Sequence, residues 1–278
     1  IFSLLFSNNL TLSLVDTSRI SITFISSLNF YIFYKKYKIK LITLSRVISL
    51  ILLIEIIYSL YPLFNFLIFN DIQLLDFGKL PTSLLGVSGN RNVLGFDIVF
   101  KLIFVLYSFI NTKSIYKYFY LLLIFFTSSL LLLLSSRGAL VMFIFVCFLF
   151  LLHIFKSKLF LNLFFLFPIL CSLASVRYLD SNRYNLVTKV SSIGLSDTST
   201  THRIFLYENT IDYIVKNPFI GCGIGNWKVE SLPYWKDRLS GYTIPYHAHN
   251  DFLEFSAETG LLGGLSYLLV FIIIFCNW

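Results

Sequence analysis

Charged side chains are scarce in this sequence. Asp, Glu, Lys and Arg make up 13% of its 278 residues, against roughly 25% in soluble domains. The mean hydropathy is +0.79 and 57% of the residues are hydrophobic. This composition excludes an ordinary soluble domain and predicts an all-α polytopic integral membrane protein.

Acidic residues and patterned cysteines are also few. The 14 Asp and Glu are outnumbered by 22 Lys and Arg, but no dense basic stripe with interleaved aromatics is present, so no nucleic-acid partner is expected. The 4 cysteines are scattered, and only Cys222 lies in a polar segment, which excludes a disulfide framework and a zinc-ligand pattern. The sequence opens on Ile1 without a charged leader and cleavage site, which indicates a fragment that has lost N-terminal spans.

Long apolar runs are what the sequence has in abundance. At about 20 apolar residues for each span, they predict a bundle of about seven or more transmembrane helices with one long outward loop. The runs lie at residues 20–34, 47–69, 93–110, 118–134, 139–155, 159–176 and 261–278. The chain accordingly divides into a transmembrane bundle (1–176), a long outward loop (177–250) and a final transmembrane helix (251–278).

Lysines fall in every second connection between these runs. They are Lys35, Lys36, Lys38 and Lys40, then Lys113 and Lys117, then Lys156 and Lys158. The positive-inside rule makes those connections cytoplasmic. Residues 70–92, 135–138 and 177–250 are then predicted to face outward.

Each outward segment carries an arginine near a predicted helix start. Arg91 lies in GNRN (89–92), which is explained equally by a capped turn at the membrane boundary. Arg137 lies in SSRG (135–138), where it either snorkels or contacts an anionic ligand with its planar fork of donors. Arg203 falls in the first turn of an amphipathic loop helix, where a cation opposes the helix dipole unless an anion is near.

Two further patterns lie in or beside the spans. Asp97 and Lys101 are spaced to form a structural i,i+4 pair, and Glu55 stands alone in its span. The segment FIGCGIGNW (219–227) lacks G-x-G-x-x-G spacing and a Walker lysine. It predicts a sharp re-entrant turn with Trp227 at the membrane interface.

The most informative stretch is PYHAHNDFLEFSAETGLLGG (245–264), at the mouth of the final helix. His247, His249 and Asp251 could bind a metal if the segment is extended. Asn250 or Asp251 could cap the helix, with Glu254 completing a capping box. One histidine could act as a general base on a hydroxyl. Only the last interpretation also uses the outward arginines.

From Gly86 onward the motifs occur in the order GNRN, SSRG, a loop helix opened by Arg203 that ends in NPFIGCGIGNW, and HAHNDFLEFSAETGLLGG. Together they resemble the O-antigen ligase and O-antigen polymerase superfamily of bacterial envelope glycan enzymes. The resemblance implies a GT-C-like, multi-pass glycosyltransferase of the bacterial inner membrane, with its active site on the periplasmic side. It implies neither a cofactor, a nucleotide sugar nor a required metal.

The resemblance also implies substrates and roles. The donor would be a glycan linked to undecaprenyl pyrophosphate, and the acceptor a hydroxyl of lipid A-core or of another glycan, with membrane lipids around both. Arg137, Arg203 and Arg91 would bind the pyrophosphate, and His249 or His247 would be the catalytic base. The supporting residues would be Asn250, Glu258 and Asn92.

Other functions are disfavoured. A ligase is preferred to a polymerase that joins repeat units, because the HAHN and glycine-rich segments are closer to ligase-type members. A transporter would be expected to show inverted repeats and broken helices at the midplane, and no repeat is evident. A non-catalytic envelope protein would leave the arginines and histidines unexplained.

Overall fold

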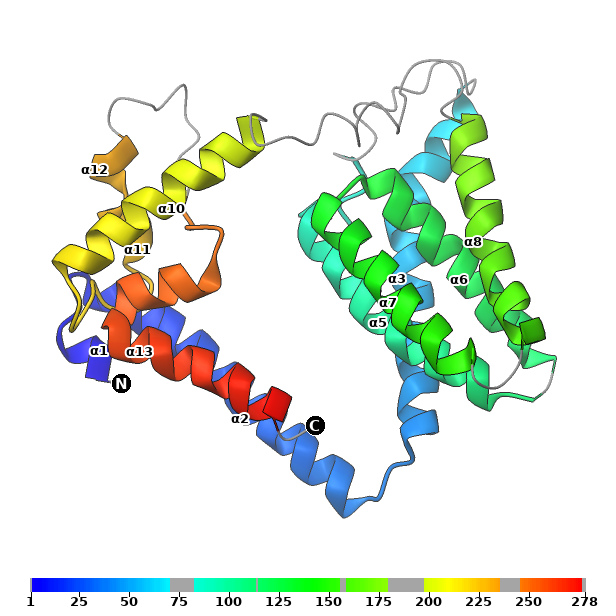
Figure 1. The fold of residues 1–278 in the computed structure, drawn as a ribbon, viewed down its shortest axis with the longest axis horizontal. Helices are drawn as coiled ribbons and strands as arrows, with labels where there is room; N and C mark the ends of the chain where they lie inside the picture. Colours follow the sequence, from blue (N-terminus) through cyan, green and yellow to red (C-terminus); the bar gives the residue numbers. More distant parts are fainter. Residues whose placement is uncertain are drawn as a thin grey trace. The chain divides into compact units, whose positions relative to one another are not determined.

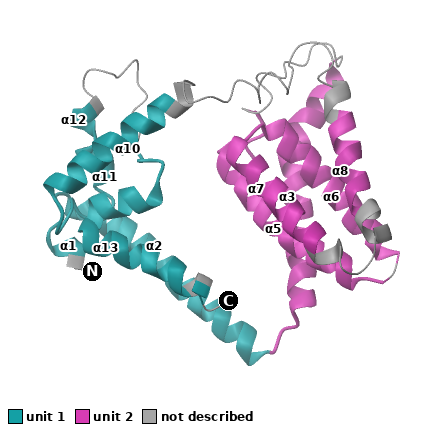
Figure 2. Cartoon of the chain, viewed as in Figure 1, with its two compact units in different colours: residues 1–37, 191–278 teal, residues 38–190 magenta. Residues whose placement is uncertain are grey.

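The computed structural model describes residues 2–70, 83–113, 115–155, 159–179, 198–235 and 246–276, in which the elements of secondary structure are helices. They divide into two compact units (Figure 2). Unit 1 comprises residues 1–37 and 191–278, and unit 2 comprises residues 38–190. The predicted all-α class is confirmed.

Unit 2 is a helical bundle. Its helices are α3 (Leu41–Phe69), α5 (Arg91–Asn111), α6 (Tyr116–Leu134), α7 (Arg137–Phe155) and α8 (Leu159–Leu179). Helix α5 packs against α3, α6 and α7, while α6 packs against α8 (Figure 1). Leu102, Ile98 and Ile124 are fully buried in the core. The five helices follow the apolar runs predicted for this part of the chain, with ends that differ by a few residues.

An ion-paired cluster joins α3 to α5 inside unit 2. Lys101 Nζ lies 2.6 Å from Glu55 Oε2 and 2.5 Å from Asp97 Oδ2. The predicted Asp97–Lys101 pair is therefore confirmed. Glu55, the isolated acidic residue of its predicted span, forms a hydrogen bond inside the bundle, because the packing of α3 against α5 brings it to the same lysine.

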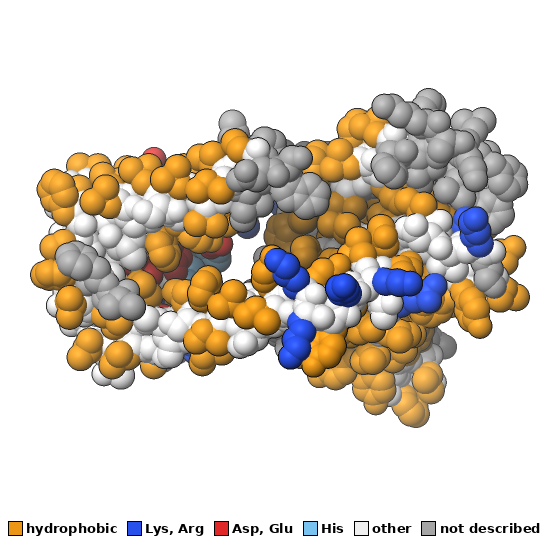
Figure 3. All heavy atoms as spheres, turned by 90° about the horizontal axis from the view of Figure 1, so that it is seen from below, with side chains coloured by type: hydrophobic (Ala, Val, Ile, Leu, Met, Phe, Trp, Pro, Cys, Tyr) orange, Lys and Arg blue, Asp and Glu red, His pale blue; other side chains and the backbone are white. Residues whose placement is uncertain are grey.

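Both ends of unit 2 carry cations, and one end carries more of them. Lys38 and Lys40 precede α3 and Arg46 lies near its start, while Lys113 precedes α6 and Lys117 lies in its first turn, so these five cations share one end of the bundle. Figure 3 shows Lys and Arg side chains gathered on this face. Arg91 and Arg137 begin helices at the opposite end. This placement fits the alternation of lysines on which the topology prediction rests.

Unit 1 joins the two ends of the sequence. It contains α1 (Phe2–Leu5), α2 (Leu10–Lys36), α10 (Thr198–Lys216), α11 (Trp227–Glu230), α12 (Leu232–Trp235) and α13 (Asp251–Cys276). Helix α2 starts ten residues before the predicted span at 20–34, because Asn9 caps it by accepting a hydrogen bond from the Leu12 N–H at 3.2 Å. Helix α10 packs against α13.

Four described helices are long and apolar enough to cross a membrane: α3, α5, α6 and residues Asp251–Ile273 of α13. The chain is therefore a polytopic helical membrane protein. Helices α7 and α8 have shorter apolar stretches in the part whose side chains are described, and α2 is diluted by polar residues such as Asp16. Seven or more spans and the division at 176 and 250 remain predictions, because residues 71–82, 180–197 and 236–245 lie outside the described residues.

Candidate active site

The two histidines lie in the segment that leads into α13. Asn250 caps this helix, since its Oδ1 accepts hydrogen bonds from the backbone N–H groups of Phe252 at 3.1 Å and Leu253 at 3.3 Å. The cap satisfies donors that a helix start leaves without partners. Asn250, one of the two predicted candidates, is the capping residue. The cap fixes the residue at which α13 begins, and therefore the position of His249 directly before it.

Glu254 holds this segment from within the first turn of α13. Its Oε1 lies 2.8 Å from His247 Nδ1, and its Oε2 accepts the N–H of Ala248 at 2.9 Å. One carboxylate therefore orients an imidazole ring and fixes the adjoining backbone. Glu254 was expected only to complete a capping box, so its contact with His247 went unforeseen.

His249 adopts an unusual backbone conformation. Its φ is 54°, in the left-handed region that non-glycine residues rarely enter. The Tyr207 hydroxyl of α10 donates to the His249 carbonyl at 3.2 Å, while Asn250 begins the helix on its other side. Strained backbone of this kind persists where its surroundings impose it, and it concentrates at functional sites.

The charge state of His249 is set by its surroundings. Burial lowers its pKa below the ordinary value of 6.5, and the positive charges of Arg203, His247 and His202 lower the pKa further, against an opposing effect of Glu254. Desolvation and like charges both disfavour the imidazolium form. The neutral imidazole, which can accept a proton, is therefore favoured at neutral pH.

Arg203 lies in the same unit as the histidines and is exposed on α10. The helix begins at Thr198, so Arg203 falls in its second turn. The prediction of a first-turn arginine that opposes the helix dipole is wrong, because the dipole effect fades beyond the first turn. The positive charge of Arg203 instead acts on His249, whose pKa it lowers.

A break in α13 lies at its tenth residue, about two and a half turns after the histidine segment. Gly260 has φ 77° and ψ 172°, and the helix bends there. The glycine-rich segment 218–227 bonds to the interrupted helix. The N–H groups of Cys222 and Gly223 donate to the carbonyls of Ala257 at 3.0 Å and Glu258 at 2.8 Å. The Leu261 N–H donates to the Pro218 carbonyl at 2.8 Å.

Glu258 is buried at this break, with 8% of its surface exposed. Its Oε1 accepts the backbone N–H of Trp227 at 3.3 Å. Trp227 is 1% exposed and packs edge-on against Tyr213 of α10, and its place at the membrane interface stays a prediction. The side chain of Glu258 therefore fixes the loop to the helix.

The first residues of the chain complete this framework. Asn226 Nδ2 donates to Ser7 Oγ at 2.8 Å and to Ser13 Oγ at 3.0 Å, and Ser13 Oγ donates to the Ile224 carbonyl at 2.6 Å. No pattern in the sequence predicted these partners. Their hydroxyls satisfy the polar groups of the glycine-rich segment.

In unit 2 the GNRN and SSRG motifs come together. Ser136 Oγ donates to Asn92 Oδ1 at 2.9 Å. The starts of α5 and α7 approach so closely that a Cβ on Gly95 would lie 2.7 Å from that of Ala139. Arg91 and Arg137 are the first residues of these adjoining helices, where cations are unfavourable unless an anion is bound.

The metal interpretation has no support in the described geometry. Among the residues that the structure describes, His, Cys, Asp and Glu side chains nowhere group in threes suited to a metal ion. His247 faces Glu254 instead of sharing ligands with His249 and Asp251.

The fold and the cluster define a class of protein: a polytopic helical membrane protein with imidazoles and a guanidinium beside the entry of a broken helix. Comparison with known families narrows this class. The family model described as O-antigen ligase matches residues 119–268, which is more than half of the chain, and the chain belongs to this family. No curated protein and no solved structure matches it.

Proposed function

We propose that the protein is a glycan ligase that transfers a glycan from undecaprenyl pyrophosphate to a hydroxyl of lipid A-core at the periplasmic face of the inner membrane. The observation that supports the proposal is that α10, which carries Arg203, contacts His249 at the entry of α13 through Tyr207. A base and a cation placed together suit a reaction that removes a proton from a hydroxyl and expels an anion.

His249 acts as the base in this proposal. Its neutral imidazole takes the proton of the acceptor hydroxyl, whose oxygen attacks the anomeric carbon of the donor sugar. The bond from that carbon to the pyrophosphate oxygen breaks, and its electron pair leaves with the carrier. A single displacement inverts the anomeric configuration.

Arg203 stabilises the negative charge that develops on the departing pyrophosphate. Arg91 and Arg137 are proposed to bind pyrophosphate, because their adjoining helix starts are suited to an anion and the family resemblance implies this role. Asn92 supports them through its contact with Ser136. No metal takes part in the proposed reaction.

The remaining polar residues position the base. His247 is oriented by Glu254 and supports the acceptor hydroxyl. Asn250 fixes the turn that carries His249, and Glu258 fixes the loop against the broken helix. These residues act through the backbone that holds the imidazole.

The proposal is tested by comparing His249→Ala with His247→Ala at equal membrane abundance. The assay supplies carrier-linked glycan and lipid A-core in the presence of EDTA. We expect His249→Ala to abolish transfer and His247→Ala to reduce it, since only the first removes the base. Full transfer by His249→Ala would overturn the assignment, and loss of wild-type activity in EDTA with recovery on zinc would indicate a metal enzyme.

A deletion strain distinguishes a ligase from a polymerase. Loss of a ligase leaves bare core, with long chains retained on the carrier. Loss of a polymerase instead gives core capped by a single repeat unit. The proposal predicts the first pattern on gels of surface polysaccharide, and the second pattern would identify a polymerase.

A further inference from the structure

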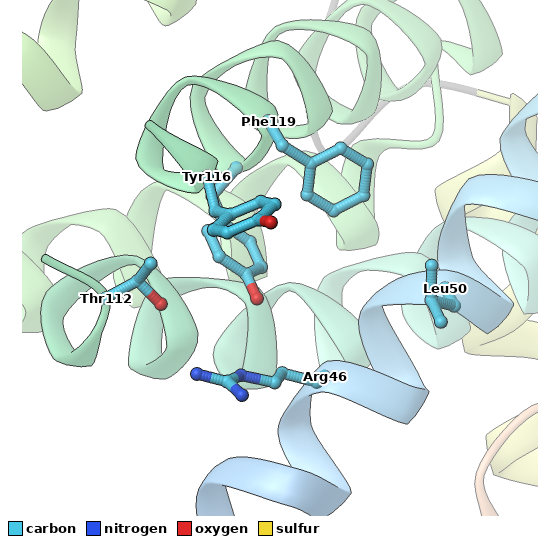
Figure 4. A pocket seen from close by; sticks show the side chains of 6 residues that line it. Arg46, Leu50, Thr112, Tyr116 and Phe119 are labelled. Carbon is cyan, nitrogen blue, oxygen red and sulfur yellow. The ribbon is translucent and has the colours of Figure 1, made fainter. Parts of the chain in front are cut away.

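A pocket lies at the lysine-bearing end of unit 2, at the opposite end of the bundle from Arg91 and Arg137. Its volume is about 550 Å³, within the range of small-molecule sites. The lining residues come from the start of α3, the end of α5 and the start of α6: Arg46, Leu50, Thr112, Tyr116, Phe119 and Tyr120 (Figure 4).

The pocket contains a polar group that lacks a partner. Thr112 is 6% exposed, and its hydroxyl forms no hydrogen bond with the residues that the structure describes. Figure 4 shows its oxygen directed toward the side on which Arg46 lies. A buried hydroxyl without a partner costs free energy, so a ligand atom that hydrogen-bonds to it would be stabilised.

The surrounding charge selects an anion. Lys38, Lys40, Arg46, Lys113 and Lys117 share this end of the bundle. The described carboxylates of unit 2 are Glu55 and Asp97, and both are paired with Lys101. Arg46 is exposed and forms no ion pair with the residues that the structure describes. Its planar set of donors suits a phosphate.

The pocket is also graded from polar to apolar along the helices. Arg46 and Tyr116 lie near the helix ends, while Leu50 follows Arg46 by four residues and Phe119 follows Tyr116 by three. At 1.5 Å for each residue, the apolar members lie about 5 Å deeper in the bundle. A free phosphate would use only the outer part, whereas a lipid would place its phosphate there and its first carbons against Leu50 and Phe119.

We propose that this pocket binds the headgroup of an anionic glycerophospholipid, with the phosphate on Arg46 and the Thr112 hydroxyl. Basic pockets between membrane helices are suited to such headgroups. The site is distinct from the proposed glycan-transfer site, because none of its lining residues belongs to the histidine segment or to the outward arginines. Its occupancy would anchor the start of α3 to the end of α5.

The test measures lipid that co-purifies with the intact protein from detergent containing equal amounts of phosphatidylglycerol and phosphatidylcholine. We expect phosphatidylglycerol to be enriched on the wild-type protein. Arg46→Gln should lower the enrichment about tenfold, the usual effect of losing a charged hydrogen bond. Arg46→Lys should retain part of it, because the charge remains.

Matched control variants distinguish binding in the pocket from a general effect of the positive charge at this end of the bundle. Lys40→Gln removes a cation of the same end that does not line the pocket, and it should leave most of the enrichment. Thr112→Val should lower the enrichment without lowering the thermal unfolding temperature, since the hydroxyl has no partner to lose. Thr17→Val makes the same change at another unpartnered buried hydroxyl, and it should alter neither quantity.

Three results would overturn the proposal. Unchanged enrichment in Arg46→Gln would show that the arginine does not bind the lipid. An equal loss in Lys40→Gln would assign the effect to diffuse charge. Complete displacement of phosphatidylglycerol by inorganic phosphate would identify a site for the free anion. Glycan transfer by Arg46→Gln is measured in parallel, so failure of this proposal is distinguishable from failure of the ligase assignment.

Discussion

The same Asp-x-x-x-Lys pair occurs once in each unit, but the two lysines have different surroundings. In unit 2, the Lys101 side chain is 19% exposed and also pairs with Glu55 of α3, while the Asp97 side chain is 41% exposed. In unit 1, Asp212 and Lys216 face outward on α10, and the lysine side chain is 64% exposed. Identical local spacing therefore gives a cross-helix junction in one unit and a solvated helix face in the other.

The two units differ more generally in what holds them together. Unit 2 has an extended apolar core, and several of its buried hydroxyls bond within their own helices, as when Thr127 donates to the Leu123 carbonyl at 2.6 Å. Unit 1 has a small apolar cluster around Trp227 and relies on hydrogen bonds between distant segments. Directional bonds fix positions more narrowly than apolar packing does, and the histidine segment lies in the unit that uses them.

The largest effect is expected from a charge in unit 1. Arg203→Ala should lower glycan transfer by about a hundredfold or more, as the loss of other preorganised charge stabilisers does. Arg203→Lys should recover part of the activity, because lysine keeps the charge but loses the bidentate fork. Lys216→Ala, a cation on the same helix, is the control. Equal losses in both alanine variants, measured at matched abundance, would show that α10 contributes only general charge.

A large effect on stability is expected in unit 2. Lys101→Met leaves Glu55 and Asp97 without their cation, and it should lower the free energy of unfolding by roughly 3 kcal/mol. The triple change Glu55→Gln, Asp97→Asn and Lys101→Met should recover most of this loss, because no unpaired charge remains. Equilibrium unfolding in detergent measures both. Lys216→Met is the control, and its free energy of unfolding should equal that of the wild type. An equal loss of stability in Lys216→Met would show that the two Asp–Lys pairs do not differ in their contribution.

A smaller effect is expected from the backbone of unit 1. Gly260→Ala combines a left-handed φ with a Cβ only 2.3 Å from the Phe219 carbonyl, and it should cost about 2 kcal/mol or more. Gly89→Ala is the matched control, because its φ is also left-handed at 64° but no atom lies within 4 Å. It should cost about 1 kcal/mol. Similar unfolding temperatures for the two variants would mean that the loop contact with α13 adds nothing.

The smallest effect concerns pH. Because the pKa of His249 is lowered, kcat/KM should stay constant down to pH 6.5 and decrease only at lower pH, where the imidazole gains a proton. His202→Gln removes one of the positive charges that lower this pKa, so the decrease should move to higher pH. Lys216→Gln serves as the reference. A decrease that stays at the same pH in His202→Gln would show that His249 is not the titrating group.

The sequence is informative where physical causes are local. Apolar runs predicted the helices of unit 2, and the amphipathic pattern after Ser199 predicted α10. Asn250 was one of two predicted caps because a helix start requires an acceptor nearby. The site residues Arg203, His247 and His249 were chosen from residue chemistry and from the family resemblance, and the structure brings these three into one unit.

Contacts between segments that are far apart in the chain could not be predicted from the sequence. Glu55 meets Lys101 only because of how two helices align, and neither helix encodes that alignment in its own pattern. Ser7 and Ser13 bond to Asn226 across most of the chain. The left-handed conformation of His249 follows from Tyr207 on another helix. Gly260 was visible as a glycine in an apolar run, but the segment that bonds to the break was not.

The bonds between the glycine-rich segment and α13 have a consequence for biosynthesis. A ribosome makes residues 218–223 well before residues 257–261. The N–H groups of Cys222 and Gly223 therefore have no acceptor until the carbonyls of Ala257 and Glu258 have been synthesised. Ser7 and Ser13 are made still earlier than their partner Asn226. The hydrogen bonds that hold the glycine-rich segment are therefore complete only when α13 has been made and inserted. A nascent chain that lacks α13 cannot present His249 in its final geometry.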